Sequence, residues 1–394
     1  MKNYFDQITT RAKDPDSFVR YILIATGTLI GVAVIQLALA SAYMFAFHEP
    51  TPRDVPVAVV GAPETTKPLA NAIEEKSDGA YSVTTFDNTA DAINELKSQG
   101  AYAIYTPKFP KSTITVATAN SKILADSIPK SLSEADRAYQ QQALQELLKS
   151  PQTSGAAGAS IEEPTVEDVA PLKQHDPNGL GMFYLAFSFV FGGYLAAVAV
   201  NLVRAKRIFN HKSAALRIVG FALFSIITSL LISSIAVWGA NIIDSNSYLP
   251  VASIGALTTF GVAMFASALI SLLGVLGTAL VILLFVVLGT PASGGPLPLA
   301  LTGAGPWHIL AALLPTGAAL DAIRQIVYFD SFKLGSHLWT PISYSVIGTI
   351  ILFVYGLRNS SISLFESAIV QNIPHKKPRT AHKKRMPGSS VDSR

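Results

Sequence analysis

From residue 218 to residue 320, a stretch of 103 residues contains one charged side chain, Asp244, and no lysine or arginine. A domain that faces water over its whole surface needs charged residues at about a quarter of its positions. Over all 394 residues the sequence has only 14 % charged residues. Runs of about 20 apolar residues match the helix length that crosses a hydrocarbon core of about 30 Å. The sequence therefore predicts an integral membrane protein.

Five uncharged stretches are long enough for a membrane helix: residues 21–47, 182–203, 218–243, 251–290 and 338–357. The fourth has 40 residues, about twice the length of one crossing. Gly274 and Gly277 lie near its middle and suit a tight turn. We therefore predict two spans in this stretch and six spans in the chain.

The distribution of charge predicts the orientation of these spans, because cytoplasmic flanks accumulate lysine and arginine. Residues 1–20 carry four basic side chains, residues 204–217 carry five and no acid, and the tail from 358 carries eight against two acids. Residues 48–180 instead hold 11 basic and 18 acidic side chains. Six spans place every basic segment in the cytoplasm, including both termini, and the acidic segment outside.

A different sixth span is conceivable, because residues 297–320 are also uncharged. That segment would cross the membrane if 251–290 crossed only once. It contains Pro298, Pro306 and Pro315, and each proline inside a helix removes a hydrogen bond. In lipid the freed backbone groups need partners. We favour a re-entrant or interfacial outer segment near residues 291–330.

The acidic segment has the alternating pattern of an α/β domain inserted between the first two spans. Residues 55–60, 81–86, 101–105 and 112–118 have the composition of strands, whereas residues 64–76, 89–99 and 121–149 have that of helices. Residues 150–160 are small and polar, as in a linker. The predicted organisation is a cytoplasmic segment 1–20, helix 21–47, α/β domain with long helix and linker 48–180, five-helix membrane domain 181–357 and basic cytoplasmic tail 358–394.

No pattern in the chain indicates covalent chemistry. There is no cysteine, no phosphate-binding Gly-x-x-x-x-Gly-Lys-Ser/Thr loop and no Gly-x-Ser-x-Gly elbow. The seven histidines lie in loops, flanks or the tail without the spacing of metal ligands. A net charge of +4 is too small to indicate nucleic acid. We predict a protein that is not an enzyme and binds no cofactor or metal of its own.

Ionisable groups are almost missing from the spans, which argues against an ion-coupled pump. Gln36 and Asn201 are the candidate lining of a transport path, with hydrogen bonding between helices as the alternative. The basic cluster of residues 204–217 suits either anionic lipid headgroups or a cytoplasmic partner. The residues of this cluster that we predict to contact such a partner are Arg204, Lys206, Arg207 and Arg217.

The segment before the last span begins an amphipathic helix at Pro315. Asp321 and Arg324 are three residues apart on that helix and can form a local ion pair. A purely structural ion pair is the simpler interpretation of these two residues. Pro315, Asp321 and Arg324 are nevertheless the candidate functional residues of the outer segment.

This organisation resembles the membrane subunit of type-2 ABC exporters, near the branch of the phage-infection-protein group. The resembling residues are the strand VPVAVV at 55–60, the segment 89–105, and LPTGAALDAIR at 314–324 before the last span. The Gly/Pro-rich PASGGPLP at 291–298 resembles the short hairpin that precedes the last motif. Residues 61–63 depart from the polar turn that often follows the first strand in the family.

The resemblance implies a permease subunit in the bacterial plasma membrane that exports a hydrophobic or amphipathic substrate. A separate ABC ATPase would use the ATP and contact the basic loop and the N-terminal segment, and the permease would form a homodimer or pair with a similar permease among membrane lipids. The alternative is an envelope receptor or scaffold whose outer domain binds a ligand, a wall polymer or a phage.

Overall fold

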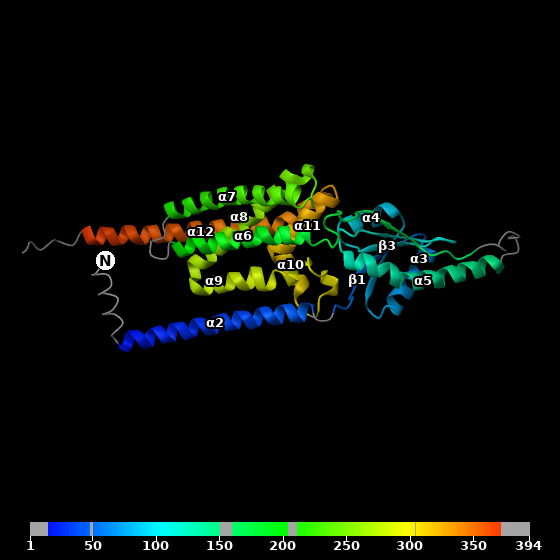
Figure 1. Ribbon diagram of the computed structural model, residues 1–394, viewed down its shortest axis with the longest axis horizontal. Helices are drawn as coiled ribbons and strands as arrows, with labels where there is room; N and C mark the ends of the chain where they lie inside the picture. The colour runs from blue at the N-terminus through cyan, green and yellow to red at the C-terminus, as the bar shows by residue number, and fades with distance from the viewer. Residues whose placement is uncertain (1–14, 48–49, 150–159, 204–210, 304, 372–394) are drawn as a thin grey trace, which may run out of the picture.

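The computed structural model describes residues 15–47, 50–149, 160–203, 211–303 and 305–371. These residues form a bundle of long helices at one end and an α/β unit at the other (Figure 1). Helix α2 (Pro15–Phe47) enters the α/β unit, and α6 (Gly181–Val203) leaves it. The two ends of α6 therefore lie at opposite ends of the bundle, with the α/β unit at one and residue 203 at the other.

The α/β unit contains a five-stranded sheet in the order β2-β1-β3-β4-β5. Its strands are β1 (Val55–Val60), β2 (Tyr81–Phe86), β3 (Ala103–Thr106), β4 (Thr113–Val116) and β5 (Thr165–Asp168). β1 pairs in parallel with β2 and β3, β4 pairs in parallel with β5, and β3 and β4 are antiparallel. Strand β5 lies in a part of the chain for which the sequence pattern predicts no strand, and its four residues are all exposed.

Three helices complete this unit: α3 (Pro63–Lys76), α4 (Thr89–Lys97) and α5 (Lys122–Lys149). Asn88 caps α4, because its side chain accepts a hydrogen bond from the Asp91 backbone nitrogen at 2.9 Å. One apolar core joins β1 and β3 to Leu124 and Ile128 of α5. A second core on the other face joins the sheet to α4. Because both faces of β1 are buried, its sequence is apolar throughout and does not alternate between apolar and polar residues.

A buried polar group lies between the sheet and α5. The Tyr105 hydroxyl donates to a carboxylate oxygen of Asp136 at 2.7 Å, and both side chains are fully buried. Gln140, one turn further along α5, donates to the Ser112 hydroxyl and to the Lys108 carbonyl, each at 2.9 Å. Burial raises the pKa of Tyr105 above its ordinary value of 10.0, and the Asp136 carboxylate raises it further.

The raised pKa of Tyr105 predicts that the α/β unit loses stability in alkali. Folded Tyr105 keeps its proton above pH 10, whereas unfolded Tyr105 releases it, so the free energy of unfolding falls as pH rises through that range. We expect Tyr105→Phe to cost about 1–2 kcal/mol at neutral pH. This difference from the parent should shrink between about pH 10 and about pH 11, by up to about 1.4 kcal/mol per unit.

This stability can be measured in the full chain with a cysteine introduced at the buried Ala92, because the chain has no cysteine of its own. The extent of labelling of this cysteine is measured as a function of urea concentration. The A92C chain with Tyr105 intact is the matched parent. A stability difference that stayed constant from about pH 9 to about pH 11 would contradict the prediction.

Among the described residues, five helices are long and apolar enough to cross a membrane. They are α2, α6, α7 (His211–Ser234, continued by the π-helical η2, Ile235–Gly239), α8 (Tyr248–Leu273, preceded by η3, Ser245–Ser247) and α12 (Leu334–Gln371). After α8 the chain turns at Gly274, whose φ of 59° suits glycine. It continues as α9 (Val275–Ile282) and the π-helical η4 (Leu283–Leu288). Together α9 and η4 form an apolar helix shorter than a usual span, so the sixth span stays a prediction.

Residues 291–328 are broken into short pieces, which are η5 (Pro291–Ser293), η6 (Leu299–Leu301), α10 (Trp307–Leu313) and α11 (Pro315–Tyr328). Helices α10 and α11 are bent by 73° at Leu314. Pro315 starts α11 at a position where a missing N–H costs nothing. Whether this segment is re-entrant or interfacial stays a prediction.

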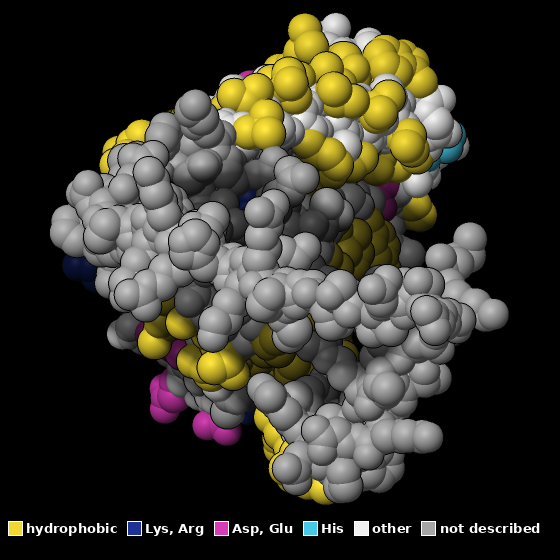
Figure 2. Space-filling view, turned by 90° about the vertical axis from the view of Figure 1, so that its left-hand side faces the viewer, with side chains coloured by type: hydrophobic (Ala, Val, Ile, Leu, Met, Phe, Trp, Pro, Cys, Tyr) yellow, Lys and Arg dark blue, Asp and Glu magenta, His cyan; other side chains and the backbone are white. Residues whose placement is uncertain are grey.

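Helix α8 lies at the centre of the bundle, with α6, α7 and α12 packed around it. Two glycines permit close approach of the backbones. A Cβ added at Gly193 of α6 would lie 2.5 Å from the Thr259 carbonyl oxygen, and one at Gly348 of α12 would collide with the Phe265 backbone nitrogen. The outward flanks of the bundle are largely hydrophobic where they are described (Figure 2). This pattern suits helices that are surrounded by lipid and associate through small residues.

Candidate functional site

Helix α11 is buried along most of its length and joins the bundle to the α/β unit. Leu320 and Ile323 pack into the apolar core of the bundle that includes α6. Phe329, directly after α11, packs instead into the core under α4 in the α/β unit. The predicted residues Pro315, Asp321 and Arg324 all belong to this helix. The structure therefore brings the outer-segment candidates to the junction between the two parts of the molecule.

Polar contacts fix α11 to the α/β unit. The side-chain amide of Gln325, which is fully buried, donates to the Lys97 carbonyl at 2.8 Å and accepts from the Lys333 backbone nitrogen at 3.1 Å. Asp321 and Arg324 form the local ion pair that their spacing predicts, at 3.5 Å. Burial raises the pKa of Tyr102, in the α/β unit, to about 12, and the nearby Arg324 opposes this shift.

Arg324 also borders a small polar cavity of about 30 Å³ at this junction. Thr118, Asn120 and Asn178 contribute polar side chains, and the backbone of Gly294 and Gly295 closes one side. A cavity of this size accommodates one or two water molecules rather than a substrate. Asp321 and Arg324 thus lie at the junction and pair with each other within α11, and a functional role for them stays a prediction.

At the opposite end of the bundle, Arg217 of α7 lies inside the helices. Its guanidinium donates to Asn201 of α6 at 2.8 Å and to Ser267 and Ser271 of α8 at 3.0 and 3.1 Å. Asn201 also donates to the Ala197 carbonyl and to Ser267. These contacts connect three helices. They correspond to the alternative interpretation of Asn201, in which it forms hydrogen bonds between helices instead of lining a transport path.

The position of Arg217 bears on one sequence-based prediction. The sequence groups this residue with a basic loop that contacts a cytoplasmic ATPase, but its side chain is 6 % exposed and turned towards α8. A contact between Arg217 and an ATPase stays a prediction. One feature of the sequence indicates this buried position. Arg217 directly precedes a long uncharged run, where an arginine tends to face the interior of the bundle.

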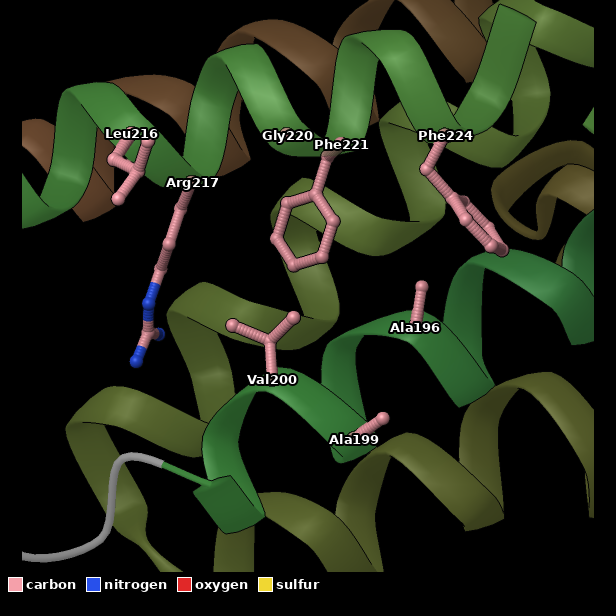
Figure 3. A pocket seen from close by; sticks show the side chains of 8 residues that line it. All are labelled: Ala196, Ala199, Val200, Leu216, Arg217, Gly220, Phe221 and Phe224. Carbon is pink, nitrogen blue, oxygen red and sulfur yellow. The ribbon is translucent and has the colours of Figure 1, made fainter. Parts of the chain in front are cut away.

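A groove of about 510 Å³ runs between α6 and α7 beside Arg217 (Figure 3). Arg217, Phe221 and Phe224 extend from α7 towards α6, and Ala196 and Val200 extend from α6 towards α7. Apart from Arg217, every lining residue is apolar: Ala196, Ala199, Val200, Leu216, Gly220, Phe221 and Phe224. The groove is therefore apolar with a cation at one end, and no sequence pattern predicts it.

The remaining predicted site residues do not join either cluster. Gln36 is exposed on α2, which contacts the bundle mainly near its end, where Tyr43 donates to the Val286 carbonyl at 3.4 Å. Arg204, Lys206 and Arg207 lie outside the described residues. Within the part of the chain that the structure describes, no three His, Asp or Glu side chains are placed to hold a metal ion.

The comparison with known families decides the class of this protein. The sequence model of the ABC-2 family transporter proteins matches residues 23–358, which is most of the chain. The chain belongs to the ABC-2 transporter family. This protein is therefore a membrane permease of an ABC transporter, a class of subunit that pairs with an ABC ATPase. The more specific likeness to the phage-infection-protein branch stays a prediction, and no curated protein or solved structure matches the chain.

Proposed function

We propose that this ABC-2 permease exports a hydrophobic or amphipathic substrate from the cytoplasm or the inner leaflet, with energy from a separate ATPase. The observation that carries this proposal is the single charge, Asp244, between residues 218 and 320 of a chain in this family. Spans that contain almost no acids or bases, with Arg217 near the start of α7 as an exception, give protons and ions few coupling groups. A substrate that moves along such helices must itself be largely apolar.

The proposed orientation places both termini and the 204–210 segment in the cytoplasm of a bacterial cell, and the acidic α/β unit outside. The α/β unit and residue 203 lie at opposite ends of α6, which supports this assignment (Figure 1). The short helix formed by α9 and η4 would then complete six spans. Two copies of the chain, or one copy and a similar permease, would form the transport unit, with ATP bound only by the partner ATPase.

The basic loop is the proposed contact for the ATPase, through Arg204, Lys206 and Arg207. We expect the triple alanine variant to retain about tenfold less ATPase after purification in mild detergent, because three exposed ion pairs together contribute on the order of 1–2 kcal/mol. Mass spectrometry of the purified complex measures the ratio of ATPase to permease.

The matched control replaces three basic residues of the tail, Lys376, Lys377 and Arg379, by alanine and should keep the ATPase. Equal loss in both variants would indicate a general effect of charge instead of a specific contact. If the parent itself purified repeatedly without an ATPase, the export proposal would fail.

A second candidate function is a receptor or scaffold, and one observation favours it. A groove of about 450 Å³ lies between α3 and α5 of the α/β unit, with Leu69 and Ala72 among its apolar lining and Glu64, Lys76 and Glu146 among its charged lining. Such a mixed surface suits an external ligand. A receptor would keep its activity in the triple alanine variant of the basic loop, whereas an exporter would lose it.

A further inference from the structure

We propose that Tyr184, Trp238 and Trp339 lie at one membrane–water interface, where their rings contact lipid headgroups. This lipid-contacting surface marks the level at which the membrane ends on the side of the α/β unit. The proposal rests on the membrane location of this family and on no direction of transport, orientation of the chain or contact with an ATPase.

Three aromatic side chains that carry a polar group are exposed at the same end of the bundle. Tyr184 in the first turn of α6 is 60 % exposed, Trp238 at the end of η2 is 65 % exposed and Trp339 in the second turn of α12 is 71 % exposed. These helix ends face the α/β unit (Figure 1). Every other tryptophan and tyrosine side chain in the described part of the chain is at least partly buried. Exposed Trp and Tyr rings suit a membrane–water interface because each has an apolar body and a hydrogen-bonding group.

The polarity of the chain changes at the level of these rings. On the side of the α/β unit, Asp244 after η2 pairs with Lys173, and Lys333 directly precedes α12. On the opposite side, exposed side chains such as Ile235 on η2 and Val346 on α12 are apolar. The rings therefore lie between charged and apolar surface, as at the edge of a hydrocarbon core.

The spacing of charge along three helices matches one membrane crossing from this level. On each helix, an uncharged run separates the aromatic residue from an arginine. The two differ by 20, 21 and 19 positions, respectively, for Tyr184 and Arg204, Arg217 and Trp238, and Trp339 and Arg358. A helix of about 20 residues is about 30 Å long, which is the thickness of the hydrocarbon core. Equal spacing on three helices supports one shared plane for the three rings.

Helix α10 lies at the same level, because the Thr340 hydroxyl, next to Trp339 in the chain, donates to the Ala312 carbonyl at 3.3 Å. Two apolar side chains of α10, Ile309 and Leu313, are exposed. These side chains contact lipid at the same interface, so α10 lies along the edge of the membrane instead of crossing its core.

Fluorescence quenching of single tryptophans in proteoliposomes tests the depth of the rings. The chain contains three tryptophans, so phenylalanine replacements leave either Trp238 or Trp339 as the only one. The quenchers are phosphatidylcholines with bromine atoms either near the headgroup or near the middle of the bilayer. We expect Trp238 and Trp339 to be quenched at least about twofold more by the shallow bromines, because interfacial rings lie at the headgroup level. Tyr184→Trp and Ile309→Trp, each in a chain without the native tryptophans, should show the same preference.

Val346→Trp in the chain without the native tryptophans is the matched control. Residue 346 is exposed and lies seven residues beyond Trp339, so it shares a face of α12 with Trp339 but lies about 10 Å further along the helix. This ring should be quenched more by the deep bromines. A shallow preference at residue 346 would overturn the proposed plane.

Equal quenching of Trp238 or Trp339 by the two lipids, or stronger quenching by the deep bromines, would overturn the proposal. A ring that neither lipid quenches would lie outside the membrane and would overturn it as well. Trp307→Phe removes an indole N–H that makes no hydrogen bond within the described residues. If this change still prevents folding, Trp238→Phe and Trp339→Phe in the parent give the same depths by difference. No ATPase is present in these vesicles, so failure of this proposal and failure of the export proposal remain distinguishable.

Discussion

Replacement of Gly193 by leucine is expected to destabilise the bundle by about 3 kcal/mol or more, whereas the same replacement at the adjacent Gly192 should change stability by less than about 0.5 kcal/mol. A side chain at Gly193 collides with the Thr259 carbonyl oxygen and lies 3.0 Å from Cβ of Val262, both on α8. Backbone on a packed helix cannot yield as a flexible side chain does. At Gly192 an added Cβ meets nothing within 4 Å.

Thermal unfolding and size-exclusion chromatography in detergent measure this difference between neighbouring residues. The Gly193→Leu protein should have a lower Tm and a smaller monodisperse fraction than the Gly192→Leu protein. Similar Tm values for the two variants would mean that α6 does not pack against α8 as the structure places it.

Replacement of Phe329 by alanine should detach the α/β unit from α11. Phe329 is 3 % exposed and packs in one core with Ala92 and Leu96 of α4. Removing a buried aromatic ring costs about 3–5 kcal/mol, and this ring is part of the connection between the two parts of the molecule. The hydrogen bond from the Gln325 side chain to the Lys97 carbonyl lies at the same contact, so it should weaken as well.

Hydrogen exchange at α4 in the full-length protein reports this loss, with faster exchange expected for Phe329→Ala. Phe332→Ala is the matched control, because Phe332 is only three residues away and 45 % exposed. Exchange at α4 that is the same in both variants would show that Phe329 does not hold the α/β unit to α11.

Most elements of the α/β unit follow from local sequence signals. The predicted strands at 55–60 and 81–86 coincide with β1 and β2, and the predicted helix at 89–99 contains α4, which Asn88 caps. These elements are predictable because alternation, valine content and capping act over a few residues. Strand β5 escapes prediction because its four residues are exposed and polar, so only pairing with β4 gives it a strand conformation.

The candidate sites were less predictable, since each one joins residues far apart in the chain. The pairing of Asp321 with Arg324 follows from a spacing of three on one helix. The contact between Gln325 and Lys97 spans 228 residues, and no local pattern predicts it. Arg217 has the sequence context of a topology signal, and only the tertiary structure places Asn201 and Ser267 beside it.

By itself, the sequence determined that this chain is a membrane protein, because the hydrophobic effect requires apolar residues wherever a helix meets lipid. The distribution of basic and acidic residues likewise predicted its orientation. Only the tertiary structure decided that Arg217 points inward, that α6 and α7 leave a groove, and that α11 joins the bundle to the α/β unit. Those features depend on how helices far apart in the sequence pack in three dimensions, and close backbone approach at Gly193 and Gly348 is one part of that packing.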